Sequence, residues 1–157
     1  MRVESKCPDI PAGRARQILA GLPDARGYRV LVKPLRYRTR AHLSAWTDFD
    51  GREIVLQVPE PFEPFGEIVP FAARRRPGKG PRFVWLTEGV TFRTPREVLR
   101  FLYLHEWMHW YLREVLGRRA AAETACDRFA LRNYRRRVVT SEDADMALAR
   151  RRQNPDA

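Results

Sequence analysis

Hydrophobic and polar residues alternate in three segments of the first third of the chain, which is the pattern of half-buried β-strands. Residues 28–32 predict a strand that ends before Pro34. Residues 41–47 and 53–58 flank the turn-forming tetrapeptide 48–51 and predict a β-hairpin. We therefore expect a small, mostly antiparallel sheet in this part of the chain.

The alternation breaks down in the middle of the chain. Residues 59–81 contain six Pro, together with several Gly and a run of Arg, and this composition favours a long irregular loop. The only apolar stretch within it covers residues 68–71. Residues 82–86 then predict one more strand.

The clearest helical pattern starts directly after this strand. Thr94 and Glu97 have the spacing of a capping box, and Pro95 occupies the first helical position between them. Apolar residues recur at helical intervals up to Gly117, which is the expected stop signal. The sequence therefore predicts a helix over about 95–116.

Three further helices are expected. Pro and Gly bracket a short helical pattern at 11–21. A helix rich in Ala begins at Arg119 or Ala120 and runs to about residue 137, and a last short helix follows residue 140 and extends to about residue 152.

Strands gathered upstream of helices indicate the α+β class. The chain of 157 residues has the length of one ordinary domain. We expect the folded core to cover about 11–137 and to be followed by a basic C-terminal tail over about 138–157.

Composition narrows the setting in which the protein acts. The chain is 44% hydrophobic, but no apolar run reaches the roughly 20 residues of a membrane span. No apolar segment follows the charged N-terminus as it would in a signal peptide, so we expect a cytoplasmic protein. Cys7 and Cys126 lie far apart in the sequence, which favours two reduced thiols over a disulfide or a zinc ribbon.

The formal net charge is +11, and Arg supplies most of it. Clustered Arg can bind nucleic acid or another polyanion without reading its sequence, although a generally basic, solvated surface explains the same composition. A further run covers residues 150–152. The two runs that we consider most suited to such contacts are Arg74, Arg75 and Arg76, and Arg135, Arg136 and Arg137.

The predicted helix 95–116 carries the sequence His105-Glu106-Trp107-Met108-His109. Two His four positions apart lie on one helix face, so their ring nitrogens can converge on one metal ion. Zn²⁺ is the usual metal of this motif, and Glu106 would act as the general base on a metal-activated water. The alternative is a chance match in which both imidazoles are structural.

A catalytic zinc needs a third protein ligand. His42 is the remaining histidine, and we interpret it as structural. If the helices on either side of Gly117 form an antiparallel hairpin, Glu123 lies level with His109 and Asp127 level with His105. We therefore predict Glu123 as the third ligand, with Asp127 accepting a hydrogen bond from His105, and the reverse assignment stays open.

The combination of His105-Glu106-x-x-His109 with Glu123-x-x-Cys126-Asp127-x-Phe129-Ala130 resembles the gluzincin group of zincin metallopeptidases. It is particularly similar to the ImmA/IrrE-type peptidases, and the likeness covers about residues 94–137.

This resemblance implies a zinc-dependent hydrolase that acts on a protein or peptide substrate. It also implies an edge strand that binds extended substrate, for which 82–86 and 54–58 are the candidates. A zincin often adds a donor to the oxyanion, and Tyr134 has a suitable helical position for it, but simple core packing explains an aromatic residue at this spacing equally and is the interpretation we favour.

Two other functions fit the sequence. One is a DNA-associated protease similar to the SprT group, which uses a third His where this chain has only carboxylates downstream. The other is a basic nucleic-acid-binding module whose zinc site is not catalytic. Salt-dependent DNA binding separates both from a peptidase without nucleic-acid affinity.

Overall fold

The computed structural model describes residues 1–80, 82–119 and 122–153, and the side chains of 151–153 lie outside this description. Its larger sheet has four strands in the order β1-β2-β4-β3. These strands are β1 (Arg2–Ser5), β2 (Arg29–Leu35), β3 (Ser44–Asp48) and β4 (Glu53–Pro59). The predicted hairpin of β3 and β4 is confirmed, and the α+β class is confirmed with it.

The larger sheet is mixed, whereas the sequence predicted a mostly antiparallel one. β1, which the sequence analysis did not identify, pairs parallel with β2, and β2 pairs parallel with β4. Parallel neighbours need a crossover connection, and α1 (Ala12–Leu19) supplies it between β1 and β2.

The prediction that Pro34 ends its strand was wrong. Pro34 lies within β2 opposite Val58 of β4. The pairing of β2 with β1 ends at Val32, whose backbone carbonyl accepts a hydrogen bond from the backbone N–H of Lys6. The backbone nitrogen of Pro34 faces the same side of β2, but β1 does not extend that far. A proline there costs no ladder hydrogen bond, because its missing N–H faces the open side.

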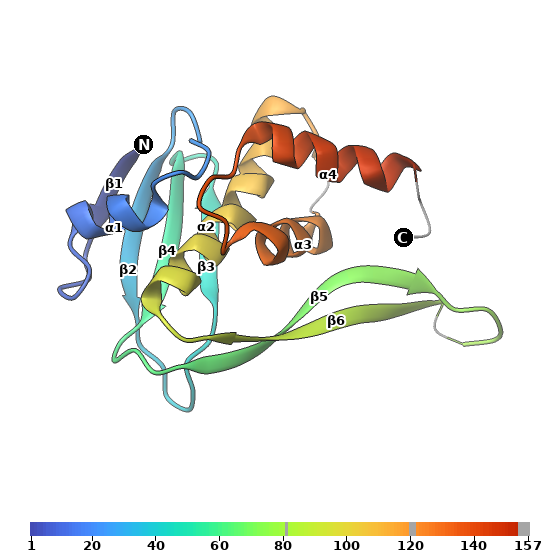
Figure 1. Cartoon of the computed structure of the whole chain (residues 1–157), viewed down its shortest axis with the longest axis horizontal. Coiled ribbons are helices and arrows are strands. Elements are labelled where there is room, and N and C mark those ends of the chain that lie inside the picture. Colours follow the sequence, from blue (N-terminus) through green and yellow to red (C-terminus); the bar gives the residue numbers. More distant parts are fainter. Residues whose placement is uncertain (81, 120–121, 154–157) are drawn as a thin grey trace.

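The segment predicted as an irregular loop at 59–81 instead forms most of a long β-hairpin. Its strands are β5 (Phe65–Arg75) and β6 (Phe83–Phe92). The strand predicted at 82–86 therefore begins at Phe83 and continues beyond Leu86 to Phe92. The pairing register shifts between Pro70 and Ala72, and a bulge is where a strand tolerates proline. Figure 1 shows the hairpin running below the helix α3 (Glu123–Asn133) and past the body of the molecule.

The helix that carries the His-Glu-x-x-His sequence forms as predicted. It is α2 (Pro95–Trp110), continued by the π-helical turn η1 (Tyr111–Val115). The hydroxyl of Thr94 accepts a hydrogen bond from the backbone N–H of Glu97 at 3.3 Å. At the other end Gly117 has a φ of 64°, which confirms it as the residue where the chain leaves the helix.

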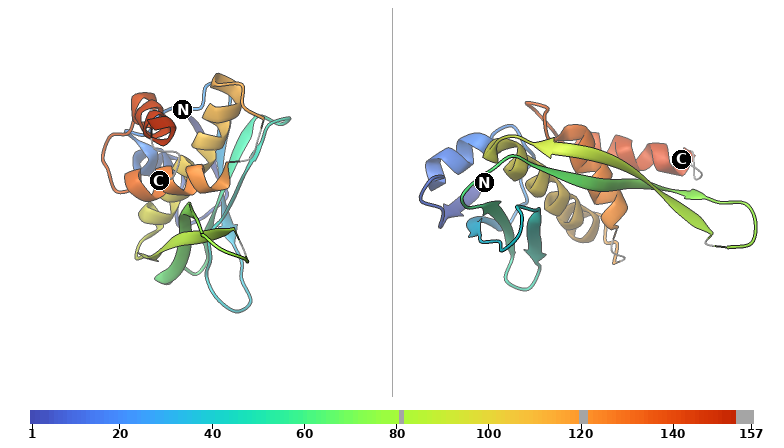
Figure 2. Two further views of the ribbon diagram at one scale, coloured as in Figure 1. Left: turned by 90° about the vertical axis from the view of Figure 1, so that its right-hand side faces the viewer. Right: turned by 90° about the horizontal axis from the view of Figure 1, so that it is seen from below.

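The last two helices are α3 (Glu123–Asn133) and α4 (Ser141–Gln153). α3 packs beside α2, and Figure 1 and Figure 2 show α4 on the same side of the larger sheet as the other helices. The sequence predicted that α3 starts at Arg119 or Ala120. Arg119 is not helical, Ala120 lies outside the described residues, and the described helix begins at Glu123.

The core is wider than the predicted range 11–137. It takes in Val3 and Ile10 at one end of the chain and Ala144 and Leu148 of α4 at the other. Residues 141–153 are therefore a packed helix and not a basic tail.

Arg100 of α2 connects several of these elements from inside the core, and it is only 2% exposed. Its guanidinium donates hydrogen bonds to backbone carbonyls alone, at the end of α1 and after α3. The charged guanidinium therefore connects the end of α1 to the end of α3 through hydrogen bonds, without an ion pair. The accepting carbonyls belong to Ile18, Ala20, Tyr134, Arg136 and Arg137.

Two further findings concern the expectations from composition. Cys7 and Cys126 are both free and buried, as expected of reduced thiols. Among the described residues no helix has the length and apolar character needed to cross a membrane.

Candidate metal centre

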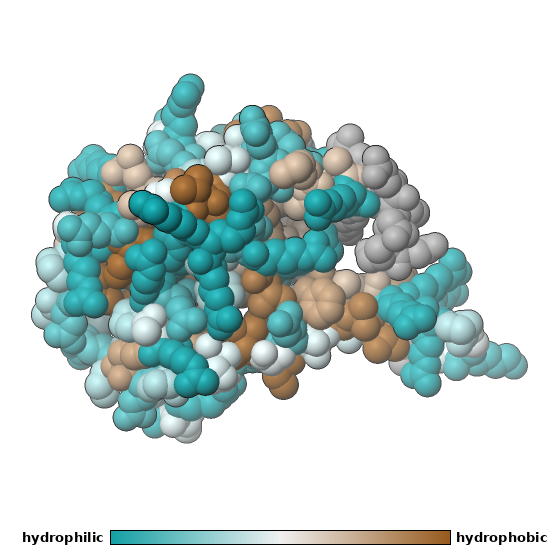
Figure 3. Space-filling view, viewed as in Figure 1, coloured by the Kyte–Doolittle hydropathy of each residue, from teal (hydrophilic) through white to brown (hydrophobic). Residues whose placement is uncertain are grey.

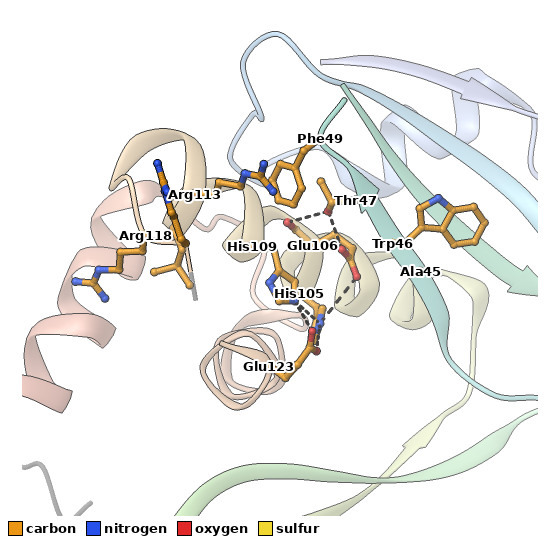
Figure 4. Close-up of a pocket in the computed structure, with 12 residues that line it drawn as sticks. Ala45, Trp46, Thr47, Phe49, His105, Glu106, His109, Arg113, Arg118 and Glu123 are labelled. Atoms are coloured by element: carbon orange, nitrogen blue, oxygen red, sulfur yellow. Dashed lines mark hydrogen bonds and ion pairs between the residues drawn. The ribbon is translucent and has the colours of Figure 1, made fainter. Parts of the chain in front are cut away.

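α2 presents His105 and His109 on one face, one helical turn apart. Their Nε2 atoms lie 3.2 Å from each other. Glu123, the first residue of α3, lies opposite them, with Oε2 at 3.1 Å from Nε2 of His105 and Oε1 at 3.1 Å from Nε2 of His109. Figure 4 shows the three side chains converging from the two helices.

These separations suit a tetrahedral metal ion. Ligand atoms at about 2.0–2.1 Å from zinc lie about 3.3–3.4 Å from one another at tetrahedral angles. The two imidazole nitrogens lie 3.2 Å apart, and each lies 3.1 Å from a different oxygen of Glu123. One ligand atom from each of the three residues is therefore close enough to the others to hold one ion. The proximity that the sequence predicted for these three residues is confirmed.

Asp127 lies one turn further along α3, behind His105. Its Oδ1 is 2.8 Å from Nδ1 of His105 and accepts a hydrogen bond from that nitrogen. With the proton held on Nδ1, the lone pair of Nε2 faces Glu123 and His109. Asp127 therefore has the position of a carboxylate that fixes the tautomer of a metal-ligating His.

Three carboxylates, those of Glu106, Glu123 and Asp127, lie close to the ring of His105. Burial lowers the pKa of His105, but the hydrogen bonds to Asp127 and Glu123 outweigh it and raise the pKa to about 10. The hydrogen bond between His105 and Glu123 also lowers the pKa of the Glu123 carboxyl, although the partial burial of that carboxyl raises it. A centre that attracts a proton this strongly also attracts a metal cation.

Glu106 lies beside this group without belonging to it. It is 6% exposed, and its Oε1 is 3.9 Å from Nε2 of His105. Thr47 of β3 donates a hydrogen bond from Oγ1 to Oε2 of Glu106 at 2.7 Å. The sequence analysis missed Thr47, because its position beside α2 depends on the order of strands in the sheet.

The centre opens into a cavity of about 400 Å³ between β3, α2 and the segment after η1. On the far side from the sheet, the cavity is bordered by Arg113, Arg118 and Arg119. The guanidinium of Arg113 packs over the ring of Phe49 at 4.1 Å, and Figure 4 shows both beside the cavity. The cavity thus has carboxylates at its metal centre and a cationic border.

The strand at the cavity is β3, not either of the strands that we expected to bind substrate. Residues 54–58 belong to β4, which is paired on both sides, and residues 82–86 belong to the β5–β6 hairpin. β3 is the terminal strand of the four-stranded sheet, and its residues Ala45, Trp46 and Thr47 line the cavity. Which strand has a free edge depends on the order of the strands in the sheet, and the local sequence pattern does not give that order.

Tyr134 does not lie where an oxyanion donor would have to be. It follows the C-terminal end of α3, at roughly 16 Å along the helix axis from Glu123. It is buried, and its ring packs against Phe92 and Phe101. The structure therefore agrees with the core-packing interpretation of Tyr134 and does not bring the residue to the candidate metal centre.

The remaining histidine stands apart from the centre. Nδ1 of His42 lies 3.2 Å from the backbone carbonyl oxygen of Arg40. His42 is not part of the group formed by the three candidate ligands, which agrees with its interpretation as a structural residue.

The Arg runs differ in their surroundings. Arg135 pairs with Glu97 at 3.5 Å, and Arg136 pairs with Asp143 at 3.0 Å. Arg74, Arg75 and Arg76 are exposed at the far end of β5. The run at 150–152 lies in α4, where the side chains of its last two residues are outside the described part of the chain.

Comparisons with models of protein families, with curated proteins and with solved structures found no match to this chain.

Proposed function

We propose that the protein is a zinc-dependent metallopeptidase. The observation that carries this proposal is the convergence of His105, His109 and Glu123 at tetrahedral ligand separations, with the carboxylate of Glu106 beside them in an open cavity. A glutamate as the third ligand favours the gluzincin arrangement over a SprT-like one, which needs a third His.

His105, His109 and Glu123 would hold the zinc, which would supply a water of lowered pKa and a Lewis acid for the carbonyl. Glu106 would serve as the base for that water and as the proton donor to the leaving amine. The hydrogen bond from Thr47 holds one oxygen of Glu106, which leaves the other, Oε1, on the side of His105. Asp127 keeps His105 in the tautomer whose Nε2 can bind a metal.

β3 provides the place for an extended peptide. The unpaired edge of a terminal strand presents backbone N–H and C=O groups to which a peptide can add as a further strand. On β3 such a peptide lies across the cavity mouth, next to Glu106. The border of Arg113, Arg118 and Arg119 favours substrates with acidic side chains near the bond that is cut.

Glu106→Gln tests the proposal. The substitution keeps the size and the hydrogen bond acceptor but removes the base. We expect zinc content to stay at the wild-type level and hydrolysis of a labelled, unfolded protein to fall by about 10²- to 10⁴-fold.

The matched control is E63Q, since Glu63 is exposed and distant in sequence from the centre. Equal hydrolysis by wild type, E106Q and E63Q prepared in the same way would refute the peptidase proposal, because the activity would then come from elsewhere.

A further inference from the structure

The far half of the β5–β6 hairpin exposes large apolar side chains. Phe83 is 59% exposed and Trp85 is 58% exposed, and Val84 and Leu86 are also exposed. Figure 3 shows hydrophobic residues along the projecting part of the molecule and hydrophilic ones at its end. A contiguous apolar strand of this kind on a surface indicates a contact with another molecule.

The strand register places the two aromatic rings on one face of the ribbon. Phe83 lies opposite Arg75, and Trp85 lies opposite Ala73. Residues two apart on a strand share a face, so Phe83, Trp85 and Arg75 are neighbours there. The small side chain of Ala73 leaves the indole of Trp85 accessible.

This part of the hairpin is also strongly basic. Residues 68–87 contain no acidic residue. Their five basic residues are Arg74, Arg75, Arg76, Lys79 and Arg82. Within the described residues no carboxylate pairs with Arg74, Arg75 or Arg76, in contrast to the ion pairs of Arg135 and Arg136. The charge at the tip is therefore available to an anionic partner.

We propose that this half of the hairpin binds single-stranded nucleic acid. Bases stack on Phe83 and Trp85, and the Arg and Lys side chains at the tip contact phosphates. A duplex buries the faces of its bases and would leave both rings without partners, so the aromatic pair favours a single strand. No residue of β5 or β6 lines the cavity at the metal centre, so this binding does not depend on the peptidase proposal.

Fluorescence anisotropy of a labelled oligothymidine of about 16 nucleotides, the upper site size of a small single-strand-binding domain, tests the proposal on the full chain. The double variant F83A/W85A should weaken binding by roughly tenfold or more for each ring. The variant F83Y/W85F keeps two rings and should retain binding. The variant R74Q/R75Q/R76Q should reduce the slope of log affinity against log salt by about 2.

The charge-matched control is R14Q/R16Q/R26Q, which removes three exposed Arg from α1 and the segment that follows it. Circular dichroism verifies that every variant is folded. Loss of binding in the hairpin variants but not in this control supports the proposal. Any of three results overturns it: no binding by wild type, equal weakening in the control, or F83A/W85A binding as tightly as wild type. Binding to vesicles of anionic lipid without binding to the oligonucleotide also overturns it and assigns the hairpin to membrane surfaces.

Discussion

Replacing Asp127 with Asn removes the negative charge behind His105 but keeps an oxygen that can accept the hydrogen bond from Nδ1. The contact is short, at 2.8 Å, and the carboxylate is only 20% exposed, so water screens it weakly. A hydrogen bond to a charged group contributes about 1.5–3 kcal/mol, of which the neutral amide recovers a part. Carboxylates behind ligating His residues typically account for 10- to 100-fold in metal affinity, or about 1.4–2.7 kcal/mol.

We therefore expect D127N to bind zinc about 10- to 100-fold more weakly than wild type. E123Q removes the charge of a carboxylate whose two oxygens each lie 3.1 Å from one of the two imidazoles, and it should be weaker still. Competition against a chromophoric zinc chelator at one fixed pH measures all of these affinities. D9N is the matched control, because Asp9 is exposed and its substitution changes the net charge equally.

The order of the two effects decides between the ligand assignments. If Asp127 were the third ligand and Glu123 the supporting carboxylate, D127N would bind zinc more weakly than E123Q. That inversion, or a D127N affinity equal to that of D9N, would refute the assignment of Glu123 as ligand.

Three further predictions follow from single contacts. Because hydrogen bonds raise the pKa of His105 to about 10 against the effect of burial, zinc must displace a proton at neutral pH. Affinity should then rise about tenfold per pH unit from about pH 6.5 to pH 8, with about one proton released in calorimetry in two buffers; an affinity independent of pH would contradict this. Arg100→Met strands several buried carbonyls and should lower the free energy of unfolding in urea by about 3–5 kcal/mol, whereas R96M on the exposed face should stay within about 0.5 kcal/mol. Thr47→Val removes the hydrogen bond that holds Glu106 and should lower kcat roughly tenfold with zinc content unchanged, while T47S should recover activity; unchanged kcat in T47V would show that the contact has no role in orienting the base.

The metal centre was predictable from sequence because local rules determine it. A capping box, a proline and a glycine define α2 and its end, and helical spacing brings His105 and His109 to one face. The chain then reverses close to Gly117. Residues at equal distances in sequence from this turn lie opposite each other, which places Glu123 and Asp127 beside the two His. This counting remained valid although the segment between the helices is longer than predicted.

The β5–β6 hairpin was not predictable by the same rules, because proline was treated as a strand breaker. In a two-stranded ribbon each strand has one open side, and a bulge relieves the pairing at Pro70. Arg100 was missed for another reason. Its acceptors lie about 80 residues upstream and about 35 residues downstream, so its role depends entirely on tertiary structure.

If Glu106 is the base and β3 binds the substrate, as we propose, the position of β3 in the sheet links the two roles. Thr47 contacts Glu106, and the adjacent Trp46 is 43% exposed, because neighbouring residues of a strand point to opposite faces. The turn between β3 and β4 fixes this register, with Thr47 opposite Ile54. A slip of one residue would exchange Thr47 and Trp46 and remove the hydrogen bond from Glu106. The same strand edge that we propose binds the peptide backbone therefore also determines where the base is held, so a peptide that pairs with β3 is aligned with Glu106 without any further contact.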